Sequence, residues 1–319
     1  MTLNHKVKEI QRVFDINAIY AKRVLGMVSN ATDFLQEIAR IIDARPKPFV
    51  KWVGGKRQLL RQFRLLDLYP PEKFDPKKSR YFEPFVGGGA VFFDLLPEKA
   101  FLSDMNFELV TTYNVIKDNI EGLIRSLKKY KYDKDFFLKV RSQNPKKLSD
   151  LQVASRFIFL NRAGFNGMYR VNSRGEFNVP FGRYTNPLIC DAENLRKASK
   201  ALQNVEIKHQ DYKMVLKKAK KGDFIYFDPP YYPVSKTSSF TSYTKDSFPD
   251  KEQIELRDTF LELHKRGCFV MLSNSDTPFI NKIYSGHKGV RISKVEAGRA
   301  INSKSTNRGK ITEVLVTNY

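Results

Sequence analysis

One apolar run with a rigid end constrains the fold of this chain more than any other stretch. Phe224, Ile225, Tyr226 and Phe227 are followed directly by Asp228-Pro229-Pro230-Tyr231. Consecutive apolar residues before a turn are typical of a buried parallel strand. The two prolines have no backbone N–H, so the chain must leave the sheet abruptly after them. Because α/β proteins bind ligands at the carboxyl ends of such strands, we expect a ligand site at this corner.

The corner offers three chemical groups close together in the chain. Asp228 supplies a carboxylate, Pro229 supplies a carbonyl without a neighbouring donor, and Tyr231 supplies an aromatic face. An exocyclic amine on a flat base would suit this set, because its hydrogens need two acceptors and its ring can stack. On these four residues alone, a strand followed by a proline turn with a capping Asp is the alternative interpretation.

The charge of the chain indicates a polyanionic partner. Its 319 residues include 56 Lys and Arg against 34 Asp and Glu, which gives a net charge of +22. This excess favours nucleic acid. A membrane surface is disfavoured, because the sequence contains no long apolar span, signal peptide or lipidation motif.

The cysteines and histidines give no metal-binding pattern. Cys190 and Cys268 are far apart, and the four histidines form no HExxH motif. We therefore expect no bound metal, no disulfide framework and a cytoplasmic location.

A second constellation lies near residue 85. The apolar residues up to Phe85 and Val86 lead into Gly87-Gly88-Gly89, and a helical stretch follows. Strand, glycine turn and helix form the first half of a nucleotide-binding unit, but the GxGxxG pattern of dinucleotide sites is absent. The next predicted strand ends at Asp104, where an acidic residue suits a pair of ribose hydroxyls. A helix-capping Asp is the alternative there. Together the two signals favour an adenosine-type cofactor.

The segment before the strand that leads into Gly87-Gly88-Gly89 carries Trp52, the Gly54-Gly55 pair and Lys56. Two glycines allow the backbone to approach a ligand closely, and Trp52 is a candidate for the wall of a cofactor pocket. The spacing does not match a P-loop.

A later segment, residues 161–184, sets Arg and Asn among glycines and aromatic residues without a helical or strand period. Such loops suit the reading of base edges and contacts with phosphates. It follows a helix expected from Leu109 to Leu127 and a basic, aromatic stretch. Beyond the corner we expect a Ser/Thr-rich loop over residues 235–243 and a basic, DNA-facing loop over residues 297–310.

In this order the motifs resemble the D12 class of Dam and DpnM-type adenine-N6 DNA methyltransferases. The matching pieces are residues 51–56, 83–89, 103–106, 166–184, 228–231 and 272–274. The resemblance covers the chain from about Pro48 to the C-terminus. It implies a Rossmann-like, S-adenosylmethionine-dependent methyltransferase sheet with an inserted, mainly helical DNA-recognition domain.

The domain boundaries follow from the same motifs. Residues 1–45 are expected to form an N-terminal helical extension, and residues 46–110 the cofactor half of the core. Residues 111–205 are expected to form the target-recognition domain, and residues 206–319 the catalytic half.

The resemblance also implies roles for individual residues. The catalytic set would be Asp228, Pro229, Pro230 and Tyr231. The cofactor-binding set would be Trp52, Lys56, Phe85, Gly87, Gly89, Asp104 and Asp228. The DNA-binding set would be Phe165, Asn166, Met168, Arg170, Asn178, Pro180 and Tyr184. Arg170 would read guanine, since an Arg bidentate to guanine is the commonest specific base contact. Phe165 replaces the Tyr of Dam-type sequences, so it keeps a stacking surface without a hydroxyl.

The activity that these matches imply is methyl transfer from S-adenosylmethionine to N6 of a flipped adenine in double-stranded DNA, within GATC. Cytosine N4, or an amine in RNA or protein, is the alternative acceptor, and a non-catalytic DNA-binding regulator is the alternative class. A separate cognate restriction endonuclease, a solitary regulatory role and a phage origin all remain open. The sequence does not define an oligomeric state.

Overall fold

The computed structural model of the protein describes residues 36, 40, 42–234, 248–298 and 310–319. Three expectations fall largely or wholly on other residues. These are the N-terminal helices of residues 1–45, the Ser/Thr-rich loop and the basic loop before the last strand.

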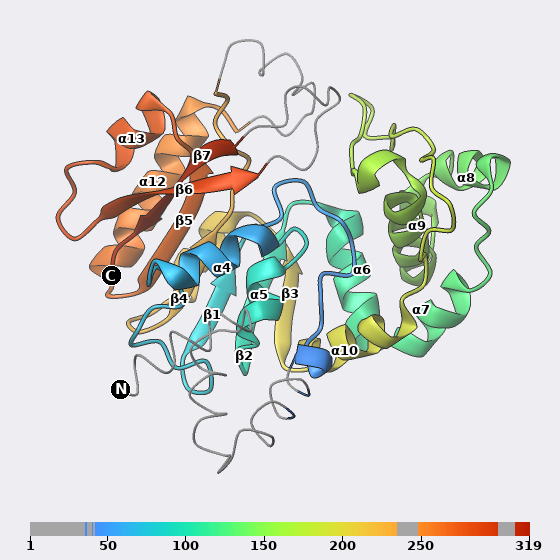
Figure 1. Ribbon diagram of the computed structural model, residues 1–319, viewed down its shortest axis with the longest axis horizontal. Helices are drawn as coiled ribbons and strands as arrows, with labels where there is room; N and C mark the ends of the chain where they lie inside the picture. The colour runs from blue at the N-terminus through green and yellow to red at the C-terminus, as the bar shows by residue number, and fades with distance from the viewer. Residues whose placement is uncertain (1–35, 37–39, 41, 235–247, 299–309) are drawn as a thin grey trace.

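The core of the protein is a seven-stranded sheet in the order β3-β2-β1-β4-β5-β7-β6 (Figure 1). The strands are β1 Arg80–Glu83, β2 Lys99–Asp104, β3 Val205–His209, β4 Phe224–Phe227, β5 Phe269–Ser275, β6 Arg291–Gly298 and β7 Lys310–Thr317. β3, β2, β1, β4 and β5 pair in parallel, and β7 lies antiparallel between β5 and β6. The predicted α/β sheet is therefore confirmed, and β4 is buried along its whole length.

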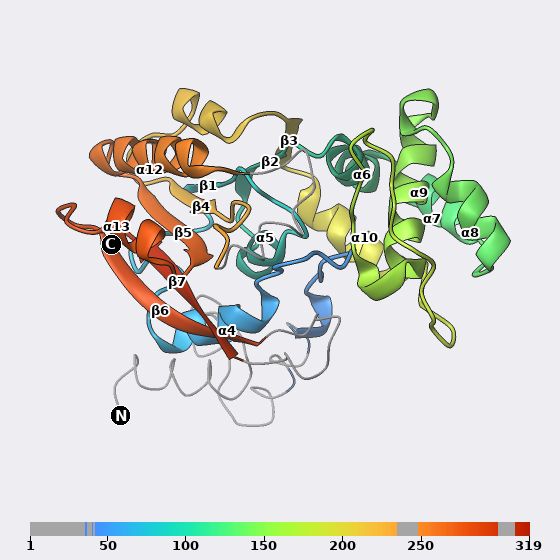
Figure 2. The ribbon, with the colours of Figure 1, turned by 90° about the horizontal axis from the view of Figure 1, so that it is seen from above.

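Helices cover both faces of this sheet. The described helices are α4 Arg57–Leu65, α5 Ala90–Leu95, α6 Phe107–Asp118, α7 Ile120–Leu127, α8 Lys134–Arg141, α9 Asp150–Ala163, α10 Ala192–Leu202, α12 Asp250–Lys265 and α13 Pro278–Tyr284. Figure 2 shows α4 and α5 on one side of the sheet and α12 on the other. Alternate residues of β4 follow this division, since Tyr226 joins the core under α4 and α5 whereas Phe227 joins the core under α12.

The inserted segment is mainly helical, as expected. α7, α8 and α9 lie beside the sheet (Figure 1), and α8 and α9 share a small core around Phe137, Phe159 and Val179. Other apolar residues of α7 and α9, including Leu123 and Phe157, pack into the sheet core. The insertion is therefore packed firmly against the sheet core.

The helix expected from Leu109 to Leu127 is two helices, so that expectation was wrong. α6 ends and α7 begins at Asn119, whose φ of −144° is not helical. Asparagine competes with helix by bonding to nearby backbone, and this explains the break.

Candidate active site

The carboxyl ends of β1 and β4 meet near the centre of the sheet. From β1 the chain adds β2 and then β3 toward one edge of the sheet, and from β4 it adds β5 toward the other edge. The direction in which strands are added therefore reverses between β1 and β4. Open α/β sheets bind their ligands at such a switch point. The glycine turn of residues 84–89 follows β1, and the corner of residues 228–231 follows β4. The fold thus brings the two predicted motifs together.

An ion pair joins the corner to the segment before α4. Lys56 Nζ lies 2.8 Å from Asp228 Oδ1, and the two side chains are 2% and 22% exposed. The same ammonium donates to the Gly54 carbonyl at 2.5 Å. It also lies 4.8 Å from the centre of the Tyr231 ring. Lys56 and Asp228, which the sequence assigned to separate motifs, therefore share one site.

The Asp228 carboxyl has a raised pKa. Burial raises this pKa to about 6, the Lys56 ammonium opposes the rise, and the charge of Glu313 adds to it. Near neutral pH the group is ionised although its surroundings favour the neutral form. A hydrogen-bond donor that enters the site therefore stabilises the charged form of this carboxylate.

Glu313 on β7 fixes the ring of the corner. Tyr231 Oη donates to Glu313 Oε2 at 2.7 Å. Burial, followed by the charge of Asp228, raises the pKa of Tyr231 well above its usual value, so the hydroxyl keeps its proton. The sequence analysis assigned no role to Glu313. The signal for a role was an acidic residue directly before the apolar run that ends the chain.

The turn after β1 is built around Gly87, whose φ is +47°. A Cβ added there would lie 2.6 Å from Cδ1 of the Trp52 indole, so only glycine leaves room for that ring. Gly87 N donates to Asp104 Oδ2 at 3.1 Å. Tyr113 Oη donates to the Gly87 carbonyl at 3.1 Å. Two predicted cofactor residues, Trp52 and Asp104, therefore both lie against a third, Gly87.

The other two predicted residues of this turn have different surroundings. A Cβ on Gly89, where φ is +68°, would lie 2.5 Å from Tyr113 Oη. The Phe85 ring packs against Tyr212, with ring centres 5.3 Å apart, and against Phe248 at 5.9 Å. Phe85 therefore borders the core under α12 rather than the Trp52 side of the turn.

Glu83 is a buried acid at the end of β1 that sequence reasoning did not single out. It is 2% exposed. It accepts from Tyr81 Oη at 2.8 Å and from Phe92 N at 3.1 Å. Burial raises the pKa of Glu83 well above its usual value, and nearby Asp228 adds to the rise. Glu83 therefore ties the start of α5 to the end of β1.

The segment predicted to read DNA forms a short 3₁₀ turn, η2 Phe165–Gly167, and a two-stranded hairpin. Phe165 is 43% exposed, and Asn166 has a φ of +54°. The Pro180 carbonyl accepts from Phe165 N at 2.9 Å, which closes the base of the hairpin. Met168 is half-buried beside this base.

Arg170 and Asn178 face each other across the hairpin. Arg170 is exposed, and its Nε donates to Asn178 Oδ1 at 2.7 Å. Asn178 N donates to the Arg170 carbonyl at 3.0 Å. Tyr184 borders the base of the hairpin, where its hydroxyl donates to the Gly164 carbonyl at 3.1 Å and its ring lies 5.1 Å from Lys51 Nζ. The structure therefore gathers six of the seven predicted residues on the hairpin and its base, and places Tyr184 between this base and the Lys51 segment.

Two residues missed as individual candidates connect this hairpin to the sheet. Tyr169 stacks on Trp52 with ring centres 5.9 Å apart, and its hydroxyl donates to Glu108 Oε1 at 2.9 Å. The Asn161 carboxamide bonds both the N–H and the carbonyl of Lys51, at 2.9 and 2.8 Å, and the Gly167 carbonyl at 2.8 Å. The recognition segment and the Trp52 segment are therefore held as one body.

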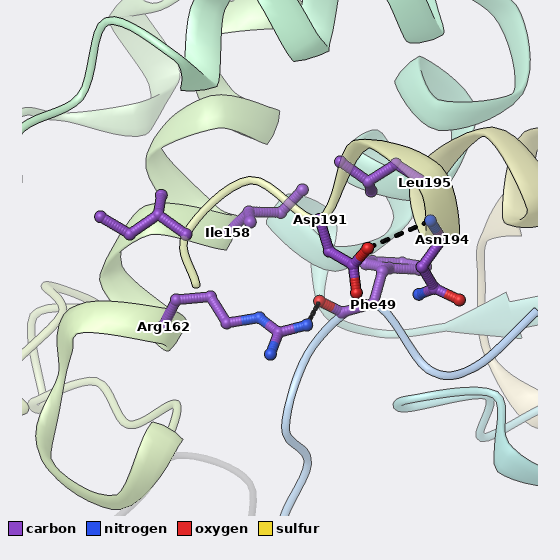
Figure 3. A pocket seen from close by; sticks show the side chains of 7 residues that line it. Phe49, Ile158, Arg162, Asp191, Asn194 and Leu195 are labelled. Atoms are coloured by element: carbon purple, nitrogen blue, oxygen red, sulfur yellow. Dashed lines mark hydrogen bonds between the residues drawn. The ribbon is translucent and has the colours of Figure 1, made fainter. Parts of the chain in front are cut away.

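A hollow lies between α9 and α10 (Figure 3). It is lined by Phe49, Ile158, Arg162, Ile189, Asp191, Asn194 and Leu195. Arg162 donates to the Phe49 carbonyl at 2.8 Å across it, as the dashed line in Figure 3 shows. The hollow has no room for a water molecule, so it is a packing junction.

Within the described residues, no group of three or more His, Cys, Asp or Glu side chains could hold a metal ion. No helix among the residues that the structure covers is long and apolar enough to cross a membrane.

The strand order and the motifs at the switch point define a Rossmann-like, S-adenosylmethionine-dependent methyltransferase fold. The comparisons narrow this class. The family model of the D12 class N6 adenine-specific DNA methyltransferases matches residues 52–301. The chain belongs to this family and is an adenine-specific DNA methyltransferase.

Individual proteins are similar to the chain over most of its length. The chain is 46% identical over 281 residues to the Type II methyltransferase M1.LlaDCHI of Lactococcus lactis subsp. cremoris, which covers 86% of this chain and 95% of that protein. It is 44% identical over 291 residues to the Type II methyltransferase M.MjaIII of Methanocaldococcus jannaschii, with coverages of 86% and 99%. The identity to the DNA adenine methylase of Escherichia coli K12 is 33% over 273 residues, with coverages of 84% and 94%.

Proposed function

We propose that this enzyme moves a methyl group from S-adenosylmethionine to N6 of an adenine that is flipped out of duplex DNA, within the sequence GATC. The observation that carries the proposal is the corner of residues 228–231 at the switch point. A carboxylate, a proline carbonyl and a Tyr ring lie there, beside the Lys56 ammonium. This set matches an amino group on a flat ring.

The chain also fits the methyl donor, which supplies an electrophilic methyl carbon on a sulfonium. Asp104 engages the N–H groups of Gly87 and Asn106 at 3.1 and 2.9 Å. A carboxylate at the end of the second strand suits a pair of ribose hydroxyls. The Trp52 ring, Gly87 and Gly89 would line the donor's pocket, with Phe85 at its edge. Lys56 and Asp228 would face its methionine end.

The chemistry needs alignment more than a strong base. Tyr231 stacks on the adenine ring, and Asp228 and the Pro229 carbonyl accept its two amino hydrogens. These bonds turn the nitrogen lone pair away from the ring and toward the methyl carbon. N6 then forms the new N–C bond while the C–S bond breaks. The amino proton that is released goes to Asp228 or to water.

Flipping places the adenine within reach of the corner at the expense of a few kcal/mol of stacking and pairing. The exposed Phe165 and the half-buried Met168 at the base of the hairpin offer apolar surface to the DNA. Pro180 and Asn166 shape this base, and Tyr184 borders it.

Recognition of guanine in GATC is assigned to Arg170. Asn178 holds the plane of the exposed guanidinium through its Nε. A fixed fork is suited to bidentate contact with guanine, which is worth about 1–3 kcal/mol against a wrong base.

A role as the modification enzyme of a restriction–modification pair is part of this proposal. The identities to the two Type II methyltransferases are 46% and 44%, whereas that to the E. coli DNA adenine methylase is 33%. A separate endonuclease from the same source that cuts GATC, and is blocked by this modification, would support the pairing.

The test is transfer of label from S-adenosylmethionine to defined duplexes. We expect label in adenine of a duplex with GATC and none in a duplex in which GATC is scrambled. Asp228→Ala should abolish transfer and keep the fold, whereas Asp258→Ala, at an exposed carboxylate on α12, should retain it. Near-normal transfer by Asp228→Ala would remove the corner from the mechanism, and label in the scrambled duplex would remove GATC.

A further inference from the structure

We propose that Gln253 on α12 and Asn274 on β5 act as one positioning unit that sets the geometry of the corner at residues 228–231. This inference rests on the catalytic role proposed for that corner. It adds two residues whose side chains hold the backbone on both sides of Tyr231.

The corner cannot hold itself in place. β4 ends at Phe227, where its pairing with β5 also ends. Pro229 and Pro230 have no N–H groups, so the sheet ladder cannot continue through them. Glu313 holds the Tyr231 hydroxyl, so another source of hydrogen bonds must fix the backbone that carries the ring.

The two amides supply these bonds. Gln253 Nε2 donates to the Pro230 carbonyl at 3.1 Å. Tyr232 N donates to Asn274 Oδ1 at 3.0 Å. The first bond holds the peptide before Tyr231, and the second holds the peptide after it.

The amides are also bonded to each other. Asn274 Nδ2 donates to Gln253 Oε1 at 3.0 Å, and both residues are fully buried. Asn274 Oδ1 also accepts from Ser275 N at 2.8 Å, and Ser275 Oγ donates to the Tyr232 carbonyl at 2.7 Å. A buried network with its bonds satisfied has one arrangement, because each alternative leaves a polar atom without a partner.

The position of the unit separates it from binding. Its contacts are with the backbone after β4, whereas Trp52, Gly87 and Asp104 lie at the ends of other segments. Loss of the unit should therefore displace Tyr231 and the Pro229 carbonyl without removing the cofactor contacts. A displacement of about 1 Å in a reacting geometry can reduce a rate on the order of 10²-fold.

The test compares Gln253→Met, Asn274→Asp and the double variant with Asn318→Leu. Gln253→Met removes the donor to Pro230, and Asn274→Asp removes the donor to Gln253. Asn318 is the matched control, because its amide bonds Val270 N at 2.7 Å and the Cys268 carbonyl at 2.9 Å, at the opposite end of β5. The measurements are the single-turnover methylation rate, the Kd values for S-adenosylmethionine and duplex DNA, and Tm.

We expect each single variant to lose on the order of 10²-fold in rate, with unchanged Kd values. The double variant should lose no more than a single one, because the pair acts as a unit. Asn318→Leu should lower Tm and keep the rate. If Gln253→Met does not fold, Gln253→Glu, which retains the acceptors, takes its place.

A wild-type rate in folded Gln253→Met, or a loss no larger than that of Asn318→Leu, overturns the positioning role. If the rate losses of the two single variants multiply in the double variant, the two residues do not act as one unit. Asp228→Ala is measured in the same assay. If Asp228→Ala is inactive while Gln253→Met is fully active, only the positioning role fails, whereas an active Asp228→Ala removes the catalytic corner itself.

Discussion

At the scale of single residues, the proposed chemistry depends on an Asp228 carboxylate that lies in surroundings that disfavour its charge. Burial raises its pKa to about 6, although Lys56 lies 2.8 Å away. One ammonium offsets only part of the lost hydration. A substrate amino group would restore hydrogen bonds to the carboxylate, and this favours binding of the amine at the reactive position.

The pH dependence of methylation should report this group. The carboxylate accepts the amino hydrogens only when it is ionised, so kcat/KM should fall as the pH drops through about 6. Because the charge of Glu313 raises the pKa of Asp228, Glu313→Gln should move this acid limb to lower pH. An acid limb that stays in place in Glu313→Gln would contradict the assignment of the limb to Asp228.

The free energy of unfolding should also depend on the pKa of Asp228, but it should decrease as the pH rises. The proton on Asp228 favours the folded state fully below its ordinary pKa of 3.8, and this contribution is lost as the pH rises through about 6. Asp228→Asn lacks this loss and should be more stable than the wild type at pH 8. The gap corresponds to at most about 3 kcal/mol.

Urea unfolding at pH 8 and pH 4 would measure this gap, which should be absent at pH 4. Asp258→Asn on the surface is the control and should leave stability unchanged at both values. Lower stability of Asp228→Asn at pH 8 would mean that the ion pair outweighs the effect of burial.

At the scale of elements, the recognition hairpin and the cofactor turn are joined by side chains from several segments. Tyr169 stacks on Trp52 and donates to Glu108, which pairs with Arg156 at 2.5 Å. Glu108 and Arg156 are both buried, so this ion pair fixes α6 against α9. Removal of one partner should be strongly destabilising, because it leaves the other charge buried.

Two arginines on the hairpin should have different roles. Arg170→Ala should weaken binding to GATC by about 1–3 kcal/mol and relax selection at guanine, because Arg170 is assigned to base contact. Arg174, whose side chain is 77% exposed at the tip, pairs with Glu176. Arg174→Ala should weaken binding to all duplexes alike. It should also reduce the slope of the logarithm of the binding constant against the logarithm of the salt concentration by about 1.

Titration of matched and scrambled duplexes at several salt concentrations separates these roles. Equal losses on both duplexes for Arg170→Ala would assign Arg170 to the phosphate backbone instead. A loss confined to GATC for Arg174→Ala would assign base reading to the tip of the hairpin.

Local chemistry explains which elements were predictable from the sequence. β4 and the turn after β1 are encoded by neighbouring residues, since apolar runs end there in prolines or glycines. β3 was missed because this edge strand has only Val205 and Ile207 as buried apolar residues. The bonds of Glu313, Gln253 and Asn274 to the corner were not predictable, because their partners lie 82, 23 and 42 positions away.

At the scale of the whole molecule, the charge and the fold support the same partner. The net charge of +22 favours DNA over most of the other partners that a Rossmann-like sheet can serve. The charge gives no sequence preference, whereas the roles proposed for the hairpin and the corner concern particular bases. In this proposal, affinity and specificity therefore depend on different parts of the chain.

The central claim is that the Asp228 corner methylates adenine N6 in GATC. The most direct test is digestion of DNA from cells that express the enzyme, with one nuclease that cuts only unmethylated GATC and one that cuts only GATC carrying N6-methyladenine. In a host without such methylation, we expect the wild type to block the first nuclease and permit the second. Asp228→Ala, expressed at the same level, should reverse both results. DNA that the wild type leaves open to the first nuclease, or that Asp228→Ala protects, would contradict the claim.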